Sequence, residues 1–556
     1  MMNFSGERSA TFDYIVIGAG SAGSVLAQHL SADPARTVAV IEAGPWDTNP
    51  YIDVPAGFVK LNAHPDLTWA FESEPTENTA GRRIRLPQGK VVGGSSSING
   101  MVYNRGQRED FDQWSGLGNP GWSYNDVLPY FRRSERRTGG GDPAFRGTEG
   151  RLPVSDHDWS DPVSEAFLTG MAEFGVERNA DYNGARQEGC AYFQRLIEHG
   201  RRVSAARAFL HPVRSRRNLK ILTRTHVTRI LLHEGRAIGV EVVDADQKNA
   251  PRQLYARREV ILSAGAINTP RVLQLSGIGP GARLAALGIP VQHDLAGVGE
   301  GLRDHYAVRV VAAAKNVLTI NEHAHGWRLA RQLLNWCIRR PSILAMAPSL
   351  AYVSTRSPNS PHRPDLQFIF TPGSYRAGKV YTLDRYPGMT GGFCQQRPES
   401  SGFVRIASKN PFDKPLIQPN YLQAERDQQV VVAGLRMIRR FMQSRAMQAY
   451  FDRETLPGPP VQSDEQLLQY AREFGITSFH YVSTARMGPR TDPTAVVDSE
   501  LRVHGLQGLR VVDASVMPMI TSANTYAATL MIAEKAADLL LGKSAAETSS
   551  KLAADG

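Results

Sequence analysis

The residues with the clearest chemical potential form a glycine turn near the N-terminus. Tyr14–Ile17 is a short apolar run, typical of a buried parallel strand, and it leads directly into Gly18-Ala19-Gly20-Ser21-Ala22-Gly23. Gly18 permits a tight turn, Gly20 lets the backbone approach a pyrophosphate, and Gly23 allows a helix to pack closely on a strand. The free N–H groups of the expected helix, residues 24–30, would face the phosphates. The pattern predicts dinucleotide binding, with Ser21 and Ala22 as further contacts.

A second expected strand strengthens this prediction. Thr37–Ile41 is apolar and ends in Glu42-Ala43. An acid at this place binds the ribose hydroxyls of a dinucleotide and disfavours a 2′-phosphate. Glycine-rich turns without a ligand are common, so the prediction depends on strand, turn, helix, strand and acid following in order.

Two later blocks are also rich in small residues. Gly89–Gly100 is dominated by glycine and serine, which let a backbone lie against a flat ligand and offer N–H donors. The apolar residues Val91, Val92 and Ile98 within it argue against a merely flexible loop. Glu259–Gly279 is typical of a strand, a small-residue turn, a short helix and a glycine stop.

The C-terminal part holds two polar residues of interest. His480 lies between Phe479 and Tyr481, and Asn524 precedes the helical run Ala527–Leu541. A histidine, with an unperturbed pKa of about 6.5, can accept a proton near neutral pH. The chain has 14 histidines, so the residue type alone does not distinguish a catalytic histidine from a core one. Asn524 on its own is typical of a helix N-cap.

Taken together, these segments resemble the glucose–methanol–choline (GMC) family of FAD-dependent oxidoreductases, from about Asp13 to Leu541. Gly89–Asp112 is similar to the first signature of the family and Gly265–Gly279 to the second. Tyr481–Gly488 and Asn524–Asp538 are similar to its C-terminal active-site region. Members like choline dehydrogenase and alcohol dehydrogenase look most similar.

The resemblance implies roles for individual residues. His480 would be the catalytic base, and Asn524 would hold the substrate oxygen. Ile98 stands where some relatives carry a histidine bonded to the flavin, which predicts non-covalent FAD. Beside the first turn and Glu42, the FAD contacts implied are Ala43, Val92, Gly94, Asn99, Gly100, Val102, Val227, Asp513, Ala514 and Thr525.

The implied activity is oxidation of a primary alcohol to an aldehyde. A base takes the hydroxyl proton, flavin N5 accepts the hydride, and a quinone or other acceptor removes the electrons. An O₂-using oxidase is the alternative, as is a non-redox lyase or photodecarboxylase on the same scaffold. Choline would need an aromatic cage, which the sequence does not locate. The alcohol, the acceptor and the oligomeric state stay open.

The resemblance and the patterning together predict an α/β chain of two domains. A discontinuous Rossmann-like FAD-binding domain would comprise residues 12–155, 220–315 and 475–543. An α+β substrate domain built on an antiparallel sheet would comprise 156–219 and 316–474. Residues 361–425 alternate in the manner of strands. Residues 315–350 look helical and could cover the pocket, with Trp327 and Trp336 lining it.

Charge and cysteine content address partners and compartment. The net charge is +10, with arginine pairs such as Arg201-Arg202; without a nucleic-acid motif these indicate solvated faces. Docking to anionic lipid, where a quinone could reoxidise the flavin, is a weaker hypothesis. The three cysteines form no disulfide or metal-site spacing, and no apolar run approaches a membrane span. We expect a cytoplasmic protein, with peripheral binding at the inner membrane as an alternative, and with loosely ordered ends (1–11 and 544–556).

Overall fold

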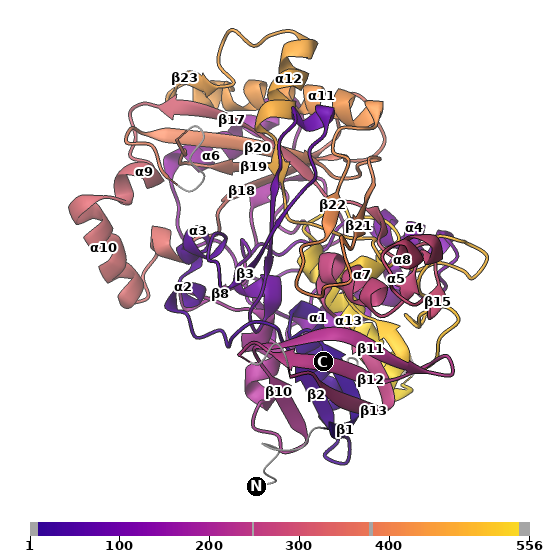
Figure 1. Ribbon diagram of the computed structural model, residues 1–556. Coiled ribbons are helices and arrows are strands. Elements are labelled where there is room, and N and C mark those ends of the chain that lie inside the picture. Colours follow the sequence, from indigo (N-terminus) through magenta and orange to yellow (C-terminus); the bar gives the residue numbers. More distant parts are fainter. Residues whose placement is uncertain (1–8, 247–249, 377–381, 544–556) are drawn as a thin grey trace.

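The computed structural model describes residues 9–246, 250–376 and 382–543. Its lower half in Figure 1 is a seven-stranded sheet whose order is β10-β2-β1-β13-β12-β11. The strands β10, β2, β1, β13 and β25 run parallel, and β25 pairs with the C-terminal half of β13. β12 and β11 continue the sheet antiparallel from the N-terminal half of β13. The strands are β1 Ser9–Ile17, β2 Val38–Ile41, β10 Leu219–Leu222, β11 Thr225–His233, β12 Arg236–Asp244, β13 Arg252–Leu262 and β25 Leu509–Val511.

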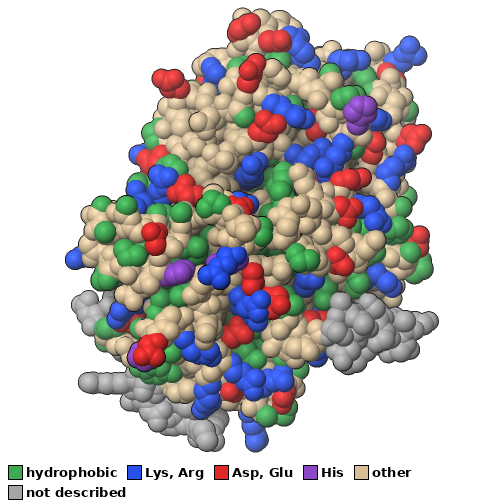
Figure 2. Space-filling model, turned by 90° about the vertical axis from the view of Figure 1, so that its right-hand side faces the viewer, with side chains coloured by type: hydrophobic (Ala, Val, Ile, Leu, Met, Phe, Trp, Pro, Cys, Tyr) green, Lys and Arg blue, Asp and Glu red, His purple; other side chains and the backbone are tan. Residues whose placement is uncertain are grey.

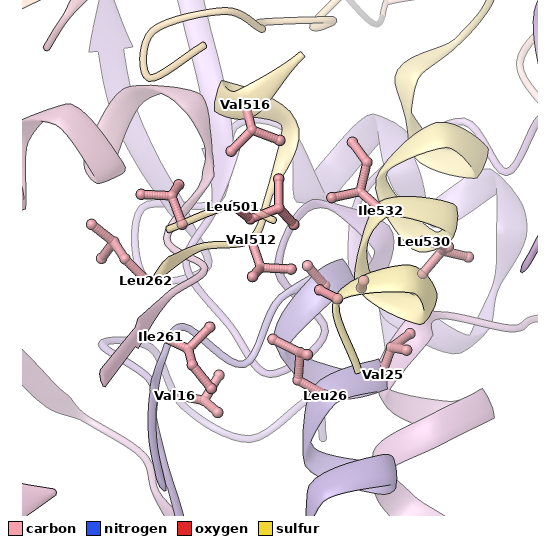
Figure 3. Packing of buried hydrophobic residues seen from close by; sticks show 14 of the residues in the cluster. Val16, Val25, Leu26, Ile261, Leu262, Leu501, Val512, Val516, Leu530 and Ile532 are labelled. Atoms are coloured by element: carbon pink, nitrogen blue, oxygen red, sulfur yellow. The ribbon is translucent and has the colours of Figure 1, made fainter. Parts of the chain in front are cut away.

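Helices α1 (Ser21–Leu30) and α13 (Thr525–Leu541) pack together against this sheet. In Figure 3, Val16 and Ile261 of the sheet lie in one cluster with Leu26 of α1 and Ile532 of α13. Every residue of α13 from 527 to 538 is buried, including the charged Glu534, Lys535 and Asp538; most of the others are apolar, as expected for a helix in the core. The core therefore fixes the start of α1 and the start of α13 relative to the same strands.

The upper half is built on a second seven-stranded sheet, which is antiparallel. Its order is β23-β17-β20-β19-β18-β7, and β24 also pairs with β17. Helices α11 and α12 lie over it at the top of Figure 1, and α6 packs beside α11. These elements are β7 Gly189–Tyr192, β17 Tyr306–Ala314, β18 Ala351–Thr355, β19 Leu366–Thr371, β20 Gly388–Gln395, β23 Phe451–Leu456, β24 Ile476–Thr477, α6 Pro162–Gly170, α11 Glu425–Met442 and α12 Asp464–Phe474.

Smaller elements join or border the two sheets. The helices are α2 Pro50–Asp53, α3 Phe58–Leu61, α4 Arg108–Gly116, α5 Tyr124–Ser134, α7 Gly265–Leu275, α8 Gly281–Ala286, α9 Ile320–His323 and α10 Gly326–Cys337. The strands are β3 Thr68–Glu72, β4 Arg85–Gly89, β5 Glu135–Arg137, β6 Leu152–Val154, β8 Ile197–Glu198, β9 Arg201–Arg202, β14 Ile278–Gly279, β15 His293–Asp294, β16 Glu300–Leu302, β21 Gly402–Arg405 and β22 Leu416–Gln418.

Most of the expected elements are present, with three differences. Residues 9–11 belong to β1 and pair with β13, so the prediction of a loose lead is wrong for them. The helical region 315–350 contains one longer helix, α10, and short turns. Trp327 is 67% exposed, so it does not line a pocket. The predicted tail, 544–556, lies outside the described residues, and the domain boundaries stay a prediction.

The surface in Figure 2 mixes lysine and arginine with aspartate and glutamate side chains, and no single charge dominates that face. Within residues 9–246, 250–376 and 382–543, no helix combines the length and apolarity needed to cross a bilayer.

Candidate active site

The predicted glycine turn joins β1 to α1. Gly18 has φ +104°, a left-handed conformation that favours glycine, and the turn lies against Ser263 and Ala264 at the end of β13. Gly20 is the N-cap of α1 and provides no side-chain cap. The first N–H groups of α1, from Ser21, Ala22 and onward, are therefore free of a side-chain acceptor at the cap, as a phosphate site requires.

Glu42 lies beside this turn. Its carboxylate accepts hydrogen bonds from the N–H of Ala19 at 3.0 Å and of Gly44 at 2.8 Å. Burial raises the pKa of Glu42 to about 7, although both backbone donors oppose that shift. Its own carbonyl accepts from the N–H of Thr225, two residues before the buried Val227 on β11. Glu42, Ala43 and Val227 thus border one region at the edge of the turn.

The second glycine block packs directly on the first. Gly93 donates its N–H to the carbonyl of Ala19 at 2.7 Å, and Val92 donates to Pro45 at 3.0 Å. A Cβ at Gly94 would lie 2.7 Å from the Cα of Gly20, closer than side chains tolerate. The close approach therefore requires glycine at position 94, and it leaves the backbone of both turns without side chains where a flat ligand would lie.

The rest of this block is hydrogen-bonded to Arg202, a buried residue that is not among the predicted site residues. The Asn99 Oδ1 accepts hydrogen bonds from Met101 N–H and from Arg202 Nη1, at 3.0 and 2.9 Å. Gly100 lies against Pro348, and Val102 pairs with Arg195. The side chain of Asn99 is therefore engaged within the protein.

Arg202 corrects the view that its arginine pair is a solvated face. The side chain is 1% exposed, and burial lowers its pKa to about 9. Its Nη2 has no hydrogen-bond partner within the described part of the chain. The pairing of Arg201 with Arg202 does not indicate that one of the two enters the core.

The third predicted FAD segment follows β25. The Asp513 carboxylate accepts from Gly265 N–H at 2.8 Å, Thr269 Oγ at 2.5 Å and Ser515 N–H at 2.8 Å. Burial raises its pKa. Asp513 thus joins the start of α7 to the turn at Ala514, and it brings both to the strand end beside Gly18.

His480 and Asn524, expected from the resemblance to be base and partner, are in contact. Asn524 Nδ2 lies 3.0 Å from His480 Nε2, and both residues are half-buried. Asn524 is the N-cap residue of α13, but its side chain caps no N–H. Its Oδ1 is buried without a hydrogen-bond partner among the described residues. The simple side-chain capping interpretation is therefore wrong.

A second histidine, His305, fixes the proton positions. His305 Nε2 lies 2.9 Å from the carbonyl of Gln396, which can only accept, so Nε2 carries the proton. In neutral His305 the Nδ1 is then an acceptor, and it lies 2.9 Å from His480 Nδ1. His480 must donate from Nδ1, which leaves a lone pair on Nε2 directed at Asn524.

The environment keeps this pair neutral. Burial, with His305 as a smaller cause, lowers the pKa of His480 well below 6.5. Burial also lowers the pKa of His305 to about 4. The main-chain N–H of His480 donates to Asp304 at 2.7 Å, which fixes the backbone. Asp304 and His305 immediately precede β17, and this polar pair before an apolar strand is the signal that could have revealed them.

These features fit FAD. Three chain segments converge at the ends of β1, β13 and β25, with a glycine cradle between Gly20 and Gly94 and a helix start without a side-chain cap. Buried Ser263 Oγ and Asn524 Oδ1 have no partner within the residues the structure describes. The segment that follows His480, residues 483–487, donates main-chain hydrogen bonds to the turn after Asp513. The histidine and the glycine cradle therefore border one region.

The chain is similar to known proteins along most of its length. Residues 12–307 and 398–533 match the GMC oxidoreductase family. An alcohol dehydrogenase [acceptor] of Pseudomonas putida is 40% identical, over 96% of both chains. The human mitochondrial choline dehydrogenase is 39% identical, over 97% of this chain and 91% of its own. An FAD-dependent oxidoreductase from Chaetomium thermophilum is 29% identical with TM-score 0.86, over 96% of this chain and 99% of its own. The chain belongs to the GMC family of FAD-dependent oxidoreductases and acts on CH–OH donors.

Proposed function

We propose that the protein oxidises a primary alcohol to an aldehyde, with His480 as the base and Asn524 as the group that binds the substrate oxygen. The observation that carries this proposal is the 3.0 Å contact between His480 Nε2 and Asn524 Nδ2. A lone pair and an N–H donor face each other there, in a half-buried place. An alcohol hydroxyl that replaces this direct contact, with the two side chains moving apart, would donate to the lone pair and accept from the amide.

The protein's part in the reaction follows from these two atoms. His480 Nε2 takes the hydroxyl proton, and Asn524 Nδ2 donates to the oxygen as negative charge develops on it. The start of α13, at Thr525, adds its positive dipole end to the same region. When bound, FAD supplies the hydride acceptor at N5.

We propose non-covalent FAD held by the residues named above. Ile98, where some relatives carry the attaching histidine, is 3% exposed and packs in an apolar cluster with Ile52, Leu61, Leu67 and Val91. An isoleucine cannot form a bond to the flavin. The buried charge of Arg202, close to Ser96 and Asn99, favours an anionic group such as a phosphate or a reduced flavin nearby.

A quinone or other acceptor in place of O₂ is favoured because the Pseudomonas putida relative is named an alcohol dehydrogenase [acceptor]. Choline stays a candidate through the human relative, and an uncharged aliphatic or arylalkyl alcohol is equally compatible with the site.

The test is an anaerobic titration of the purified protein, followed at the absorbance maximum of oxidised flavin, with an aliphatic alcohol, an arylalkyl alcohol and choline. Bleaching by one of them supports the proposal and names the substrate class. Admitting air then separates an oxidase, which recolours fast, from a dehydrogenase. No bleaching by any of them would contradict it and favour a lyase or photoenzyme. Acid precipitation should release the flavin into the supernatant.

His480→Ala tests the base. It should keep FAD, but the alcohol should bleach the flavin about 10²–10⁴ times more slowly, because a general base usually accelerates a reaction by that factor. The matched control is His323→Ala, which replaces another half-buried histidine whose pKa burial lowers, and it should bleach like wild type. Equal bleaching by wild type and His480→Ala would show that another group is the base.

A further inference from the structure

Helix α10 is amphipathic, but its apolar side faces solvent. The residues spaced along one side of it are all exposed: Trp327, Ala330, Leu334, Cys337 and Ile338. Trp327 is 67% exposed, Leu334 60% and Ile338 51%. We call these five residues the α10 stripe. A surface helix ordinarily turns its apolar side to the core, so a stripe of this size needs a partner.

The opposite side of α10 is held by specific contacts, so the outward direction of the stripe is built in. Gln332 is buried; its carbonyl accepts from Ser342 Oγ at 2.9 Å and its side chain from Ile343 N–H at 3.1 Å. Trp336 Nε1 donates to the carbonyl of Gly200 at 2.7 Å. In Figure 1 the helix projects at the left edge of the molecule, away from both sheets.

Positive charge surrounds the stripe. Arg328 and Arg331 lie on the helix, and Arg339 and Arg340 follow it directly. No aspartate or glutamate occurs anywhere from His323 to Pro364. This stretch thus combines exposed apolar residues with unbalanced basic ones, which is the composition of a helix that lies in the headgroup region of a bilayer.

A basic hollow adjoins the end of the helix. A cavity of about 370 Å³ is lined by Arg339 together with Arg201, Arg207, Glu198, His199 and Val203. Asp53 pairs with Arg201 and Arg207, and Glu198 pairs with Arg136. Three guanidinium groups around one hollow still leave an excess of positive charge, suited to a phosphate headgroup.

We propose that the α10 stripe docks the protein on an anionic phospholipid surface, with the apolar residues in the interface and the arginines on lipid phosphates. The excess positive charge selects lipid over a second copy of this chain, because two such stripes would bring their arginines together. The chain that follows α10, which ends at Cys337, leads to Pro348, and Pro348 lies against Gly100 of the second glycine block. A docked α10 would therefore hold the candidate active site close to reactants dissolved in the membrane.

The experiment is co-sedimentation of the FAD-loaded protein with vesicles of phosphatidylcholine alone or with 30% phosphatidylglycerol, at low and high salt. We expect binding to the anionic vesicles that weakens with salt. Cys337 reports the location of the stripe, because it is exposed while Cys190 and Cys394 are buried. A polarity-sensitive dye on Cys337 should shift to the blue with anionic vesicles. Absence of binding or of the blue shift would overturn the proposal.

Two double variants separate the contribution of the apolar residues to vesicle binding from that of the arginines. Leu334→Ser/Ile338→Ser should lower vesicle binding about tenfold or more, while Leu117→Ser/Val291→Ser, which replaces exposed apolar residues elsewhere, should bind like wild type. Arg339→Gln/Arg340→Gln should lose the preference for anionic lipid. Flavin content and activity on a soluble alcohol with a dye acceptor check that each variant is folded. Undiminished binding by the serine variant, or a dimer that it alone abolishes in the absence of lipid, would contradict the proposal.

Discussion

At the scale of single residues, the ability of His480 to act as a base depends on which of its ring nitrogens carries the proton. His305 holds the Nδ1 proton of His480 in place and so leaves the lone pair on Nε2. It acts through His480 and is a positioning residue, whereas His480 and Asn524 would touch the substrate. The carbonyl of Gln396 sets the direction of the whole chain of hydrogen bonds.

His305→Leu removes the acceptor for His480 Nδ1–H, so His480 can place its proton on either nitrogen and lose the base at Nε2. We expect kcat to fall at least about tenfold, but less than for His480→Ala, with a smaller change in KM and normal FAD content. Stopped-flow reduction with the substrate found above measures this. His305→Asn, whose Oδ1 can accept the same proton, should recover part of the loss. Equal rates for the leucine and asparagine variants would argue for a packing role.

The pKa of His480 predicts how activity depends on pH. Burial lowers that pKa well below 6.5, so His480 stays neutral and able to accept a proton when the pH falls from 7 to 6. The acid limb of kcat/KM, which reports the free enzyme, should therefore lie well below pH 6.5. A pH profile in buffers of constant ionic strength measures it. An acid limb at or above 6.5 would contradict a buried neutral base.

At the scale of elements, α13 is the part that places Asn524, and charged residues hold it inside the core. Arg133 Nε lies 2.5 Å from Glu534, and Arg133 Nη1 lies 2.8 Å from Asp538. His29 of α1 lies 2.9 Å from Glu534. These contacts connect α1, α5 and α13, so the first glycine turn and the Asn524 end of α13 are held by one buried network.

The pKa of Glu534 gives this network a pH dependence. Burial alone would raise that pKa, but the charges of His29 and Arg133 lower it to about 2. A depressed carboxyl pKa adds stability above its unfolded value of about 4.3, and that stability is lost as the pH falls towards 2. The shift corresponds to about 3 kcal/mol.

Glu534→Gln should therefore lower the free energy of unfolding by about 3 kcal/mol at pH 7. The difference in Tm between wild type and variant should shrink as the pH falls from 4.5 towards 2. Differential scanning fluorimetry of the FAD-loaded proteins measures this, with Glu465→Gln, a fully exposed carboxylate, as the control. A Tm difference that does not change with pH would mean that packing, not charge, is lost.

The elements also show what the sequence could predict. The turn Gly18–Gly23 and its strands were predictable because local spacing alone determines them. Arg202 was not, since its role depends on contacts with residues far away in the chain. The polar pair Asp304-His305 before an apolar strand could have marked His305, but not its contact with His480. Helical character was predicted for residues 315–350, but neither the bounds of α10 within it nor the side that α10 buries was predicted. The hydrogen bonds of Gln332 and Trp336 with residues outside the helix determine which side of α10 faces inward, and the pattern of residues in the helix does not reveal them.

At the scale of the whole molecule, the proposed FAD site is assembled from three segments that are separate in the sequence. The turns at Gly18 and Gly94 come from the first 100 residues and the turn at Asp513 from the C-terminal part of the 556-residue chain, and they meet only in the fold. A ligand bound between them stabilises the folded state against every unfolded one, by an amount set by its concentration relative to Kd. FAD should therefore raise the Tm of the flavin-free protein in a concentration-dependent way.

Gly20→Ala tests whether FAD bound at the first glycine turn stabilises the fold. The backbone of Gly20 has φ −76°, which alanine adopts readily, and an added Cβ would meet only the Cα of Gly94 at 3.8 Å. The flavin-free variant should thus melt at the wild-type temperature. The methyl group would nevertheless occupy the cradle where the pyrophosphate is expected, so at least about tenfold more FAD should be needed for the same rise in Tm, a loss of about 1.4 kcal/mol. Gly116→Ala, which meets nothing within 4 Å, is the matched control. If Gly20→Ala kept the full response to FAD, the pyrophosphate would have to lie elsewhere, and the assignment of the first turn would be wrong.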